Sequence, residues 1–320
     1  MAKTKKVIVA CMRNEALFVV EWVAHHLAMG FNQILVYTND CDDGTDRILQ
    51  LLGQNSPVLH FDNPGPYEAG SIQKQALALA FARPEVKDSD WVLHIDADEY
   101  VDVTIGNRKI DNLIDLYPDA DAIALMWRLF GSAGKKTWEG GSVIESFIRC
   151  EGKLPDVAAG ELAVFKTLFR PQKFTVMSVH EPKLPVRGFV PKVVNTAGVE
   201  MPIKTLLSKR GSNYAVGPDQ VTWENGCLHH HHVKSDDLHL MKHARGDANG
   251  RGNIKRVIGS DFYRYADRND VQLNSLVQLR PRVRRREARL RAIAGVVEAE
   301  AAAWAWFQAH FHGEAALIAV

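Results

Sequence analysis

Cysteine is scarce in this 320-residue chain, and its few cysteines form no recognisable pairing. The four residues, Cys11, Cys41, Cys150 and Cys227, lie far apart, and none belongs to a Cys-x-x-Cys motif. This usage argues against a disulfide framework and against a cysteine-based zinc site. It is typical of an intracellular protein whose thiols stay reduced.

Long apolar runs and a dominant charge are also missing. No stretch approaches the roughly 18 apolar residues of a transmembrane helix, and the N-terminal apolar stretch is too short for a signal peptide. Lys plus Arg total 39 and Asp plus Glu total 38, which gives a formal net charge of +1. This balance gives no reason to expect nucleic acid as a partner. We therefore expect a cytoplasmic protein, with peripheral contact at the inner face of the membrane left open.

Apolar strand-like and helix-like segments alternate along the first hundred residues. Such alternation with short connections predicts an α/β fold, in which a mostly parallel sheet is flanked by helices on both faces. The expected strands span 7–10, 34–37, 58–61, 91–95 and 121–130, and the expected helices span 16–29, 45–52 and 70–82.

The fourth expected strand ends abruptly in carboxylates, at Asp96-Ala97-Asp98-Glu99. Residues i and i+2 of an extended chain point to the same face, so Asp96 and Asp98 are expected to aim together at the strand end. Oxygen ligands of this kind suit a hard divalent cation, which can in turn hold a diphosphate. An isolated Asp-x-Asp is more often only a solvated turn.

Polar loops follow three of the expected strands, and right-handed crossovers bring them to one edge of the sheet. Asn14, Glu15 and Asn39 lie in the first two loops and are candidates for binding a nucleoside; the alternative is that they cap turns. Gln73 and Lys74 open a helix, where backbone amides and a cation can meet a phosphate or a sugar. Lys74 alone would more often be a solvated surface residue.

The order of these motifs resembles that of family-2-like glycosyltransferases. The similarity rests on residues 9–15, 21–26, 37–45, 73–74, 96–99, 127–132 and 230–235. It implies a GT-A fold of the Rossmann-like nucleotide-diphospho-sugar transferase type, a nucleotide-sugar donor and Mn²⁺ or Mg²⁺. It also implies a catalytic domain over 1–255, with a nucleotide-binding half over 1–100 and an acceptor half over 101–255. Residues 256–320 are then expected to form a C-terminal helical extension.

The resemblance extends to individual side chains. It implies that Asp98 is a direct metal ligand, and that Asp96 binds the metal, its water or a ribose hydroxyl. The late histidine falls on His230, with His232 as the neighbouring alternative on the same strand face. Lys234, Lys242 and Arg245 are expected to close over the diphosphate when the donor binds.

The catalytic base is the open assignment. An inverting transferase needs a carboxylate or a histidine to take the proton of the acceptor hydroxyl. The Glu-Asp pair that family-2 enzymes often carry is missing from the expected region. The candidates are His180 and Glu181, with Glu139 as an alternative, and a retaining reaction would not need a base placed in this manner.

The sequence therefore predicts a metal-dependent, inverting glycosyltransferase that moves a sugar, expected to come from a UDP-sugar, to a hydroxyl of a glycan or glycolipid. Two other classes remain open. A nucleotidyltransferase could use the same sheet and metal, although the first loop is not a Gly-rich phosphate loop. A non-catalytic nucleotide-sugar-binding protein would not need both carboxylates.

The last part of the chain has a different character. Apolar residues from 290 to 311 recur at steps of three or four, after a segment dense in arginine. This pattern predicts one long helix with an apolar stripe. We expect the helix to pack onto the catalytic domain or to mediate a homodimer. A basic helix lying on a membrane surface is the functional alternative.

Overall fold

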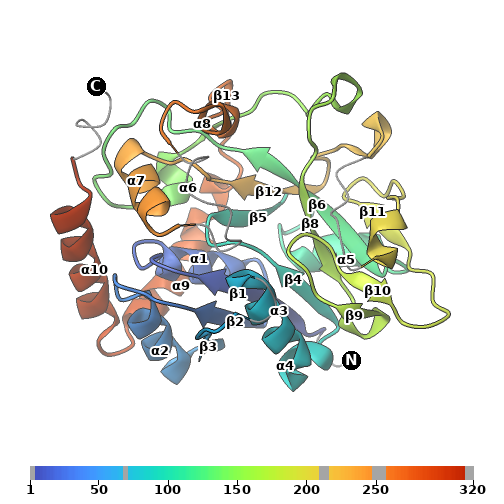
Figure 1. Cartoon of the computed structure of the whole chain (residues 1–320), viewed down its shortest axis with the longest axis horizontal. Helices are drawn as coiled ribbons and strands as arrows, with labels where there is room; N and C mark the ends of the chain where they lie inside the picture. The colour runs from blue at the N-terminus through green and yellow to red at the C-terminus, as the bar shows by residue number, and fades with distance from the viewer. Residues whose placement is uncertain (1–3, 68–70, 209–215, 247–256, 314–320) are drawn as a thin grey trace.

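A nine-stranded mixed sheet organises the molecule (Figure 1). The computed structural model describes residues 4–67, 71–208, 216–246 and 257–313. The predicted α/β architecture, with a mostly parallel sheet flanked by helices, is confirmed. The expected domain boundary between residues 255 and 256, and the expected start of one helix at residue 70, lie outside the described residues.

The strands alternate with helices through the first half of the chain and with loops thereafter. The helices are α1 (Val19–Ala28), α2 (Thr45–Asn55), α3 (Ile72–Ala82), α4 (Pro84–Lys87), α5 (Ile110–Leu116), α6 (Val143–Ser146), α7 (Asp236–Ala244), α8 (Asp261–Ala266), α9 (Arg280–Arg291) and α10 (Val296–His310). The strands are β1 (Lys6–Met12), β2 (Gln33–Thr38), β3 (Val58–Asp62), β4 (Trp91–His94), β5 (Glu99–Val103), β6 (Ala122–Leu129), β7 (Arg149–Cys150), β8 (Phe165–Phe169), β9 (Phe174–Val176), β10 (Lys183–Pro185), β11 (Val193–Asn195), β12 (Gly226–His230) and β13 (Val271–Gln272).

The sheet has a parallel half and a mixed half. Its order is β3-β2-β1-β4-β8-β6-β12-β5, with β11 paired to β6. The strands β3, β2, β1 and β4 are parallel neighbours, whereas β8 runs antiparallel to both β4 and β6. Strand β12 is parallel to β6 and antiparallel to β5. The carboxyl ends of β1, β4, β6 and β12 therefore open toward one edge, where α/β sheets bind ligands.

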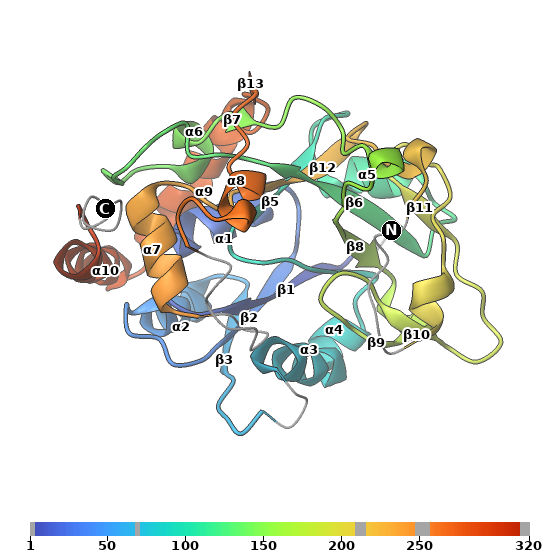
Figure 2. The same ribbon diagram turned by 45° about the horizontal axis from the view of Figure 1, so that its top comes forward.

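Alternation of side chains along the strands fills a core on each face of the sheet. In β1, Ile8 and Ala10 join the core under α1 and α2, whereas Val7 and Val9 join the core under α3 and α4. Figure 2 shows α1 and α3 on opposite sides of β1. This is the period-two pattern expected of a strand buried on both faces.

The C-terminal region forms two helices, so the prediction of one long helix is wrong. Helix α9 ends at Arg291, and after a short turn Gly295, in a left-handed conformation (φ 86°), precedes the first residue of α10. Helix α9 packs against α1, and α10 packs against α2 (Figure 1). Phe307 of α10 is fully buried in the core that α1 and α2 share. The two helices are thus part of the same packed body.

Among the described residues, no helix has both the length and the apolar character that crossing a membrane requires.

The packing of α10 can be tested by truncating one buried side chain. We expect Phe307→Ala to lower the free energy of unfolding by roughly 3–5 kcal/mol, because it removes a fully buried ring. Val297→Ala, on the same helix but 52% exposed, serves as the control and should change stability by about 0.5 kcal/mol or less. Urea denaturation measures both. Equal effects of the two substitutions would contradict the packing of α10 into the core.

Candidate active site

A cleft of about 480 Å³ lies at the carboxyl ends of β1 and β4. It is lined by Cys11, Met12, Arg13, Glu15, Asn39, Ile72, Gln73, Asp96, Ala97, Asp98, Trp127, Val179, His180, His230, His232, Lys242, Arg245, Gly246 and Phe262. These residues come from the first, second and fourth strand ends, from α3, and from the later strands β6 and β12. The predicted convergence of polar loops therefore occurs at this edge.

The first two loops are held together by their own polar side chains. Asn14 accepts a hydrogen bond from the backbone N–H of Asp42 (2.9 Å), so it caps the neighbouring loop and does not line the cleft. Glu15 and Asn39 do line it. The Arg245 guanidinium pairs with Glu15 and donates to the carbonyl oxygen of Arg13 (2.9 Å). Arg245 thus ties the end of α7 to the loop after β1.

Asp96 faces a buried lysine rather than a shared metal position. Its carboxylate accepts hydrogen bonds from Lys166 Nζ (2.9 Å) and Gln73 Nε2 (2.8 Å). Burial raises the pKa of Asp96, but the Lys166 ammonium outweighs this effect and holds the pKa below its ordinary value. The carboxylate of Glu99 lies 3.7 Å from the same ammonium, and burial raises its pKa well above the usual range.

Asp98 belongs to a different cluster. Residues 97–98 form a turn between β4 and β5, so the expectation that Asp96 and Asp98 share one face of an extended strand is wrong. The buried Asp98 carboxylate lies 3.5 Å from His230 Nε2 and 4.0 Å from His232 Nδ1. Among the described residues that line the cleft, these three side chains have ligand atoms close enough together to hold one metal ion. Asp96 is not in that group.

The histidine run alternates between two environments. His229 Nε2 lies 3.1 Å from the Asp102 carboxylate, and His231 packs against buried aromatic rings. His230 and His232 instead point into the cleft. Burial lowers the pKa of both cleft imidazoles, so each is a neutral nitrogen donor of the kind that a metal ion requires.

Lys242 of α7 puts a cation into this cluster. Its ammonium pairs with the Asp98 carboxylate and lies 2.9 Å from His232 Nδ1. Burial alone would raise the pKa of Asp98, but Lys242 and then His230 hold that pKa well below the usual range. A positive charge therefore already balances Asp98 at the position where a metal ion would bind.

Only one of the three candidate bases lines the cleft. His180 does so, whereas Glu181 is buried in an ion pair with Lys183 (2.7 Å) outside the lining. Glu139 is 76% exposed on a loop and accepts a hydrogen bond from Thr137. Neither carboxylate can therefore reach a substrate in the cleft without moving.

His180 is a neutral acceptor rather than a strong base. Its Nδ1 lies 3.2 Å from the carbonyl oxygen of Phe165, and because a carbonyl only accepts, Nδ1 carries the proton. Burial and the nearby Lys166 ammonium lower the pKa of His180 to about 3. The ring therefore takes up a proton poorly.

Two further predicted contacts lie away from the cleft. Lys74 is exposed on α3, and the ammonium of Lys234 lies 4.6 Å from the centre of the Phe18 ring. Conversely, sequence reasoning missed Lys166 and did not assign Trp127, whose rings line the cleft floor beside His230. The only signal for Lys166 was a single lysine inside the apolar strand β8.

Residues 7–201 match the sequence model of glycosyltransferase family 92. A rice protein (Oryza sativa subsp. japonica), named as a glycosyltransferase family 92 protein, is 25% identical over 128 residues. That match covers 39% of this chain and 21% of the relative, so the chain spans about a fifth of the relative's length. Both findings support a glycosyltransferase, and the matched family model covers more than half of this chain.

Solved structures show weaker similarity. S. aureus TarS 1–349 in complex with UDP-GlcNAc aligns with a TM-score of 0.27 and 18% identity, covering 44% of this chain and 37% of that one. HddC from Yersinia pseudotuberculosis aligns with a TM-score of 0.32 and 11% identity, covering 62% of this chain and 93% of the other. Scores at this level support no conclusion about ligands.

The pairing of Lys166 with two carboxylates can be tested by removing its charge. We expect Lys166→Met to lower the free energy of unfolding by about 3 kcal/mol at neutral pH, because it removes the buried ammonium that the partly buried Asp96 and the buried Glu99 share. Without that cation the folded-state pKa of Asp96 rises above its unfolded value, and that of Glu99, which burial already raises, rises further. The loss should therefore shrink as the pH falls toward about 4 and the carboxyls bind protons.

Urea denaturation of Lys166→Met and of Lys166→Met/Glu99→Gln measures this effect. The second substitution should restore part of the lost stability, since a neutral amide then replaces the buried Glu99 carboxyl that has lost its neighbouring cation. A loss that is independent of pH and unrelieved by Glu99→Gln would show that Lys166 acts through packing alone.

Proposed function

Because the chain belongs to glycosyltransferase family 92, we propose that it transfers a sugar from a nucleotide-sugar donor to a hydroxyl of a glycan or glycolipid acceptor. The observation that carries this proposal is the cluster of Asp98, His230 and His232 at the carboxyl end of the sheet. The nucleotide sugar is proposed to bind in the cleft with its diphosphate beside this cluster. UDP-sugars are the first donors to test, and GT-A is the fold type that we assign.

The donor set suits a divalent cation. One carboxylate and two neutral imidazoles lie with their ligand atoms within 4.8 Å of one another, all buried. Such a mixed oxygen and nitrogen set fits Mn²⁺ better than Mg²⁺, which prefers oxygen ligands. A bound cation would supply charge stabilisation for the departing diphosphate. We propose that Asp98, His230 and His232 hold it.

Lys242 has two roles in this proposal, one for each state of the site. With no metal bound, its ammonium balances the buried charge of Asp98. Two cations cannot share this position, because like charges at contact distance repel strongly in a buried site. When the metal site is filled, Lys242 would leave Asp98, and a diphosphate oxygen is the acceptor that its ammonium would meet in the cleft.

The loops after β1 and β2 are proposed to hold the nucleoside. Glu15 and Asn39 both line the cleft and offer a carboxylate and an amide to the base or the ribose. Gln73 and Lys166 fix Asp96 in place, where its carboxylate can accept a ribose or sugar hydroxyl. The pair of Arg245 and Glu15 keeps α7 closed over this end of the cleft.

The acceptor is proposed to approach from the side of His180 and Trp127. A neutral imidazole orients a hydroxyl by accepting its hydrogen bond, and an indole face suits the apolar face of a sugar ring. Inversion of the anomeric centre and the identity of the base stay predictions of the sequence resemblance. The carboxylates among the described cleft residues are Glu15, Asp96 and Asp98.

The metal and donor proposals are tested together with Asp98→Asn. We expect the variant to release nucleotide from its preferred sugar donor about 100-fold or more slowly with Mn²⁺ present, because the charged ligand is lost. Asp115→Asn, the same change on an exposed position of α5, is the control and should match the wild type. A panel of UDP- and GDP-sugars, with and without EDTA, identifies the donor. Turnover that survives both Asp98→Asn and EDTA would contradict the proposal.

A nucleotidyltransferase would instead release pyrophosphate from a nucleoside triphosphate, and a binding protein would bind the nucleotide sugar without consuming it. The same panel distinguishes these functions, since each predicts a different product.

If a metal ion and the Lys242 ammonium compete for Asp98, removing the ammonium should increase the affinity for the metal. We expect Lys242→Met to bind Mn²⁺ about tenfold more tightly than the wild type, because the competing ammonium is removed from Asp98. Electron paramagnetic resonance of free Mn²⁺ measures the affinity without any turnover. Lys153→Met, at an exposed position, controls for the change in net charge. Unchanged or weaker Mn²⁺ binding by Lys242→Met would show that the ammonium does not occupy the metal position.

A further inference from the structure

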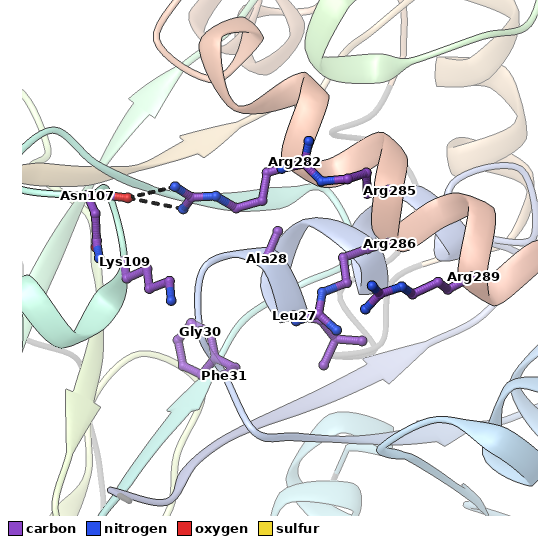
Figure 3. A pocket seen from close by; sticks show the side chains of 10 residues that line it. All are labelled: Leu27, Ala28, Gly30, Phe31, Asn107, Lys109, Arg282, Arg285, Arg286 and Arg289. Carbon is purple, nitrogen blue, oxygen red and sulfur yellow. Dashed lines mark hydrogen bonds between the residues drawn. The ribbon is translucent and has the colours of Figure 1, made fainter.

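A second pocket lies at the other end of α1 from the cleft. Helix α1 starts beside the loop after β1, and its last residues, Leu27 and Ala28, line this pocket together with Gly30 and Phe31. The remaining lining residues are Asn107, Lys109, Arg282, Arg285, Arg286 and Arg289. We call this space, of about 450 Å³, the arginine pocket (Figure 3). It shares no lining residue with the cleft.

All the charged residues that line the arginine pocket are cationic. Four arginines of α9 and Lys109 contribute positive charge, and none of the ten lining residues is acidic. Asp111 lies next to Gly30, but its carboxylate is already paired with the buried ammonium of Lys6. Five cations therefore gather around a space without a neighbouring carboxylate left to balance them.

Helix α9 separates its arginines by face. Arg280, Arg284 and Arg291 each form an ion pair with glutamate. On the pocket face, no hydrogen bond or ion pair joins the guanidinium groups of Arg285, Arg286 or Arg289 to another residue within the described ranges. Acidic partners are thus present on one face of the helix and missing on the other.

The spacing of the pocket arginines makes them one cationic face. Positions 282, 285, 286 and 289 are three, four and seven residues apart, so their side chains are neighbours on the helix surface. Arg282 donates from both terminal nitrogens to the carbonyl oxygen of Asn107 (3.0 Å each), which fixes one side of the pocket (Figure 3). Lys109 lies across from the helix (Figure 3).

Interactions within the fold balance only a small part of the positive charge in the arginine pocket. The end of α1 carries a partial negative charge that attracts a nearby cation, but the effect is equivalent to about half a charge and fades within the last turn. Like charges three and four residues apart on a helix destabilise it. A cluster of five cations therefore costs the fold some stability, which a bound anion would restore.

We propose that the arginine pocket binds a ligand that carries two or more phosphate oxyanions. Guanidinium groups match phosphate oxygens in a bidentate fork, so several arginines together favour a polyphosphorylated group. Leu27, Ala28 and Phe31 provide an apolar floor for the rest of the ligand. Such a group can come from a soluble phosphorylated molecule or from the headgroup of an anionic lipid. Helix α9 lies outside the matched residues 7–201, and the proposal does not depend on the chemistry of the cleft.

The test compares two double variants of the full chain with equal loss of charge. Arg286→Gln/Arg289→Gln removes two exposed cations from the pocket face, and Arg284→Gln/Arg291→Gln removes two from the rest of α9. The soluble arm measures inorganic pyrophosphate binding by calorimetry, with EDTA present and salt at a physiological level. The lipid arm measures co-sedimentation with cardiolipin–phosphatidylcholine vesicles, because each cardiolipin headgroup carries two phosphates. Near-ultraviolet circular dichroism checks that every variant is folded.

We expect the pocket variant to weaken binding at least tenfold in one arm, and the control variant to stay within twofold of the wild type. A selective loss in the pyrophosphate arm identifies a soluble ligand, and a selective loss confined to vesicles identifies a lipid headgroup. Binding in neither arm, or equal loss in both variants, would overturn the proposal. Because none of these readouts involves sugar donors, its failure is distinguishable from a failure of the proposed function.

Discussion

Carboxylates crowded at the end of β4 are the constraint on which the site depends. Asp98 and Glu99 are buried and Asp96 is partly buried, and a carboxyl removed from water is costly to ionise unless a cation balances it. Lys166 pairs with Asp96 and approaches Glu99, whereas Lys242 pairs with Asp98. The turn at residues 97–98 lets the two aspartates face different cations. One acidic motif thus creates two electrostatic environments in one cleft.

The topology of the sheet supplies these cations from distant parts of the chain. Strand β8 inserts antiparallel between β4 and β6, which places Lys166 beside the end of β4. Strand β12 adds His230 from the other side, and α7, which follows it, returns Lys242 to the same place. The ion pair of Arg245 with Glu15 then closes α7 onto the loop after β1. Each later segment therefore completes a site that the first hundred residues begin.

Local patterns in the sequence predict the parts of this arrangement that depend on local structure. Apolar runs bounded by polar loops locate β1, β2 and β4 closely, and they predict the edge at which the loops meet. Asp98 and His230 follow from motif order. The pairing of Asp96 with Lys166 does not, because it joins residues 70 positions apart through an antiparallel insertion that no local period signals. Glu181 is an acidic residue that could serve as a base, but its burial in an ion pair with Lys183 depends on tertiary structure, which the local sequence does not reveal. The C-terminal helices show the opposite case, in which a local pattern misleads. A regular apolar stripe predicts one helix, but the chain forms a turn at residues 292–295 between α9 and α10.

The arginine pocket and the cleft lie at opposite ends of α1, and they differ in how their charges are balanced. The cleft contains an internal cation, Lys242, that already neutralises its principal carboxylate. The arginine pocket has no internal anion among the described residues that line it. A metal ion in the cleft would thus displace Lys242 from Asp98, whereas an anionic ligand in the arginine pocket would provide the missing negative charge.

Anomalous X-ray scattering at the manganese edge, from crystals grown with Mn²⁺ and UDP, tests the central claim most directly. The account predicts one strong peak bonded to Asp98, His230 and His232, next to the diphosphate, with the Lys242 ammonium moved away from Asp98. UDP bound in the cleft without a manganese peak, and with Lys242 still paired to Asp98, would contradict it.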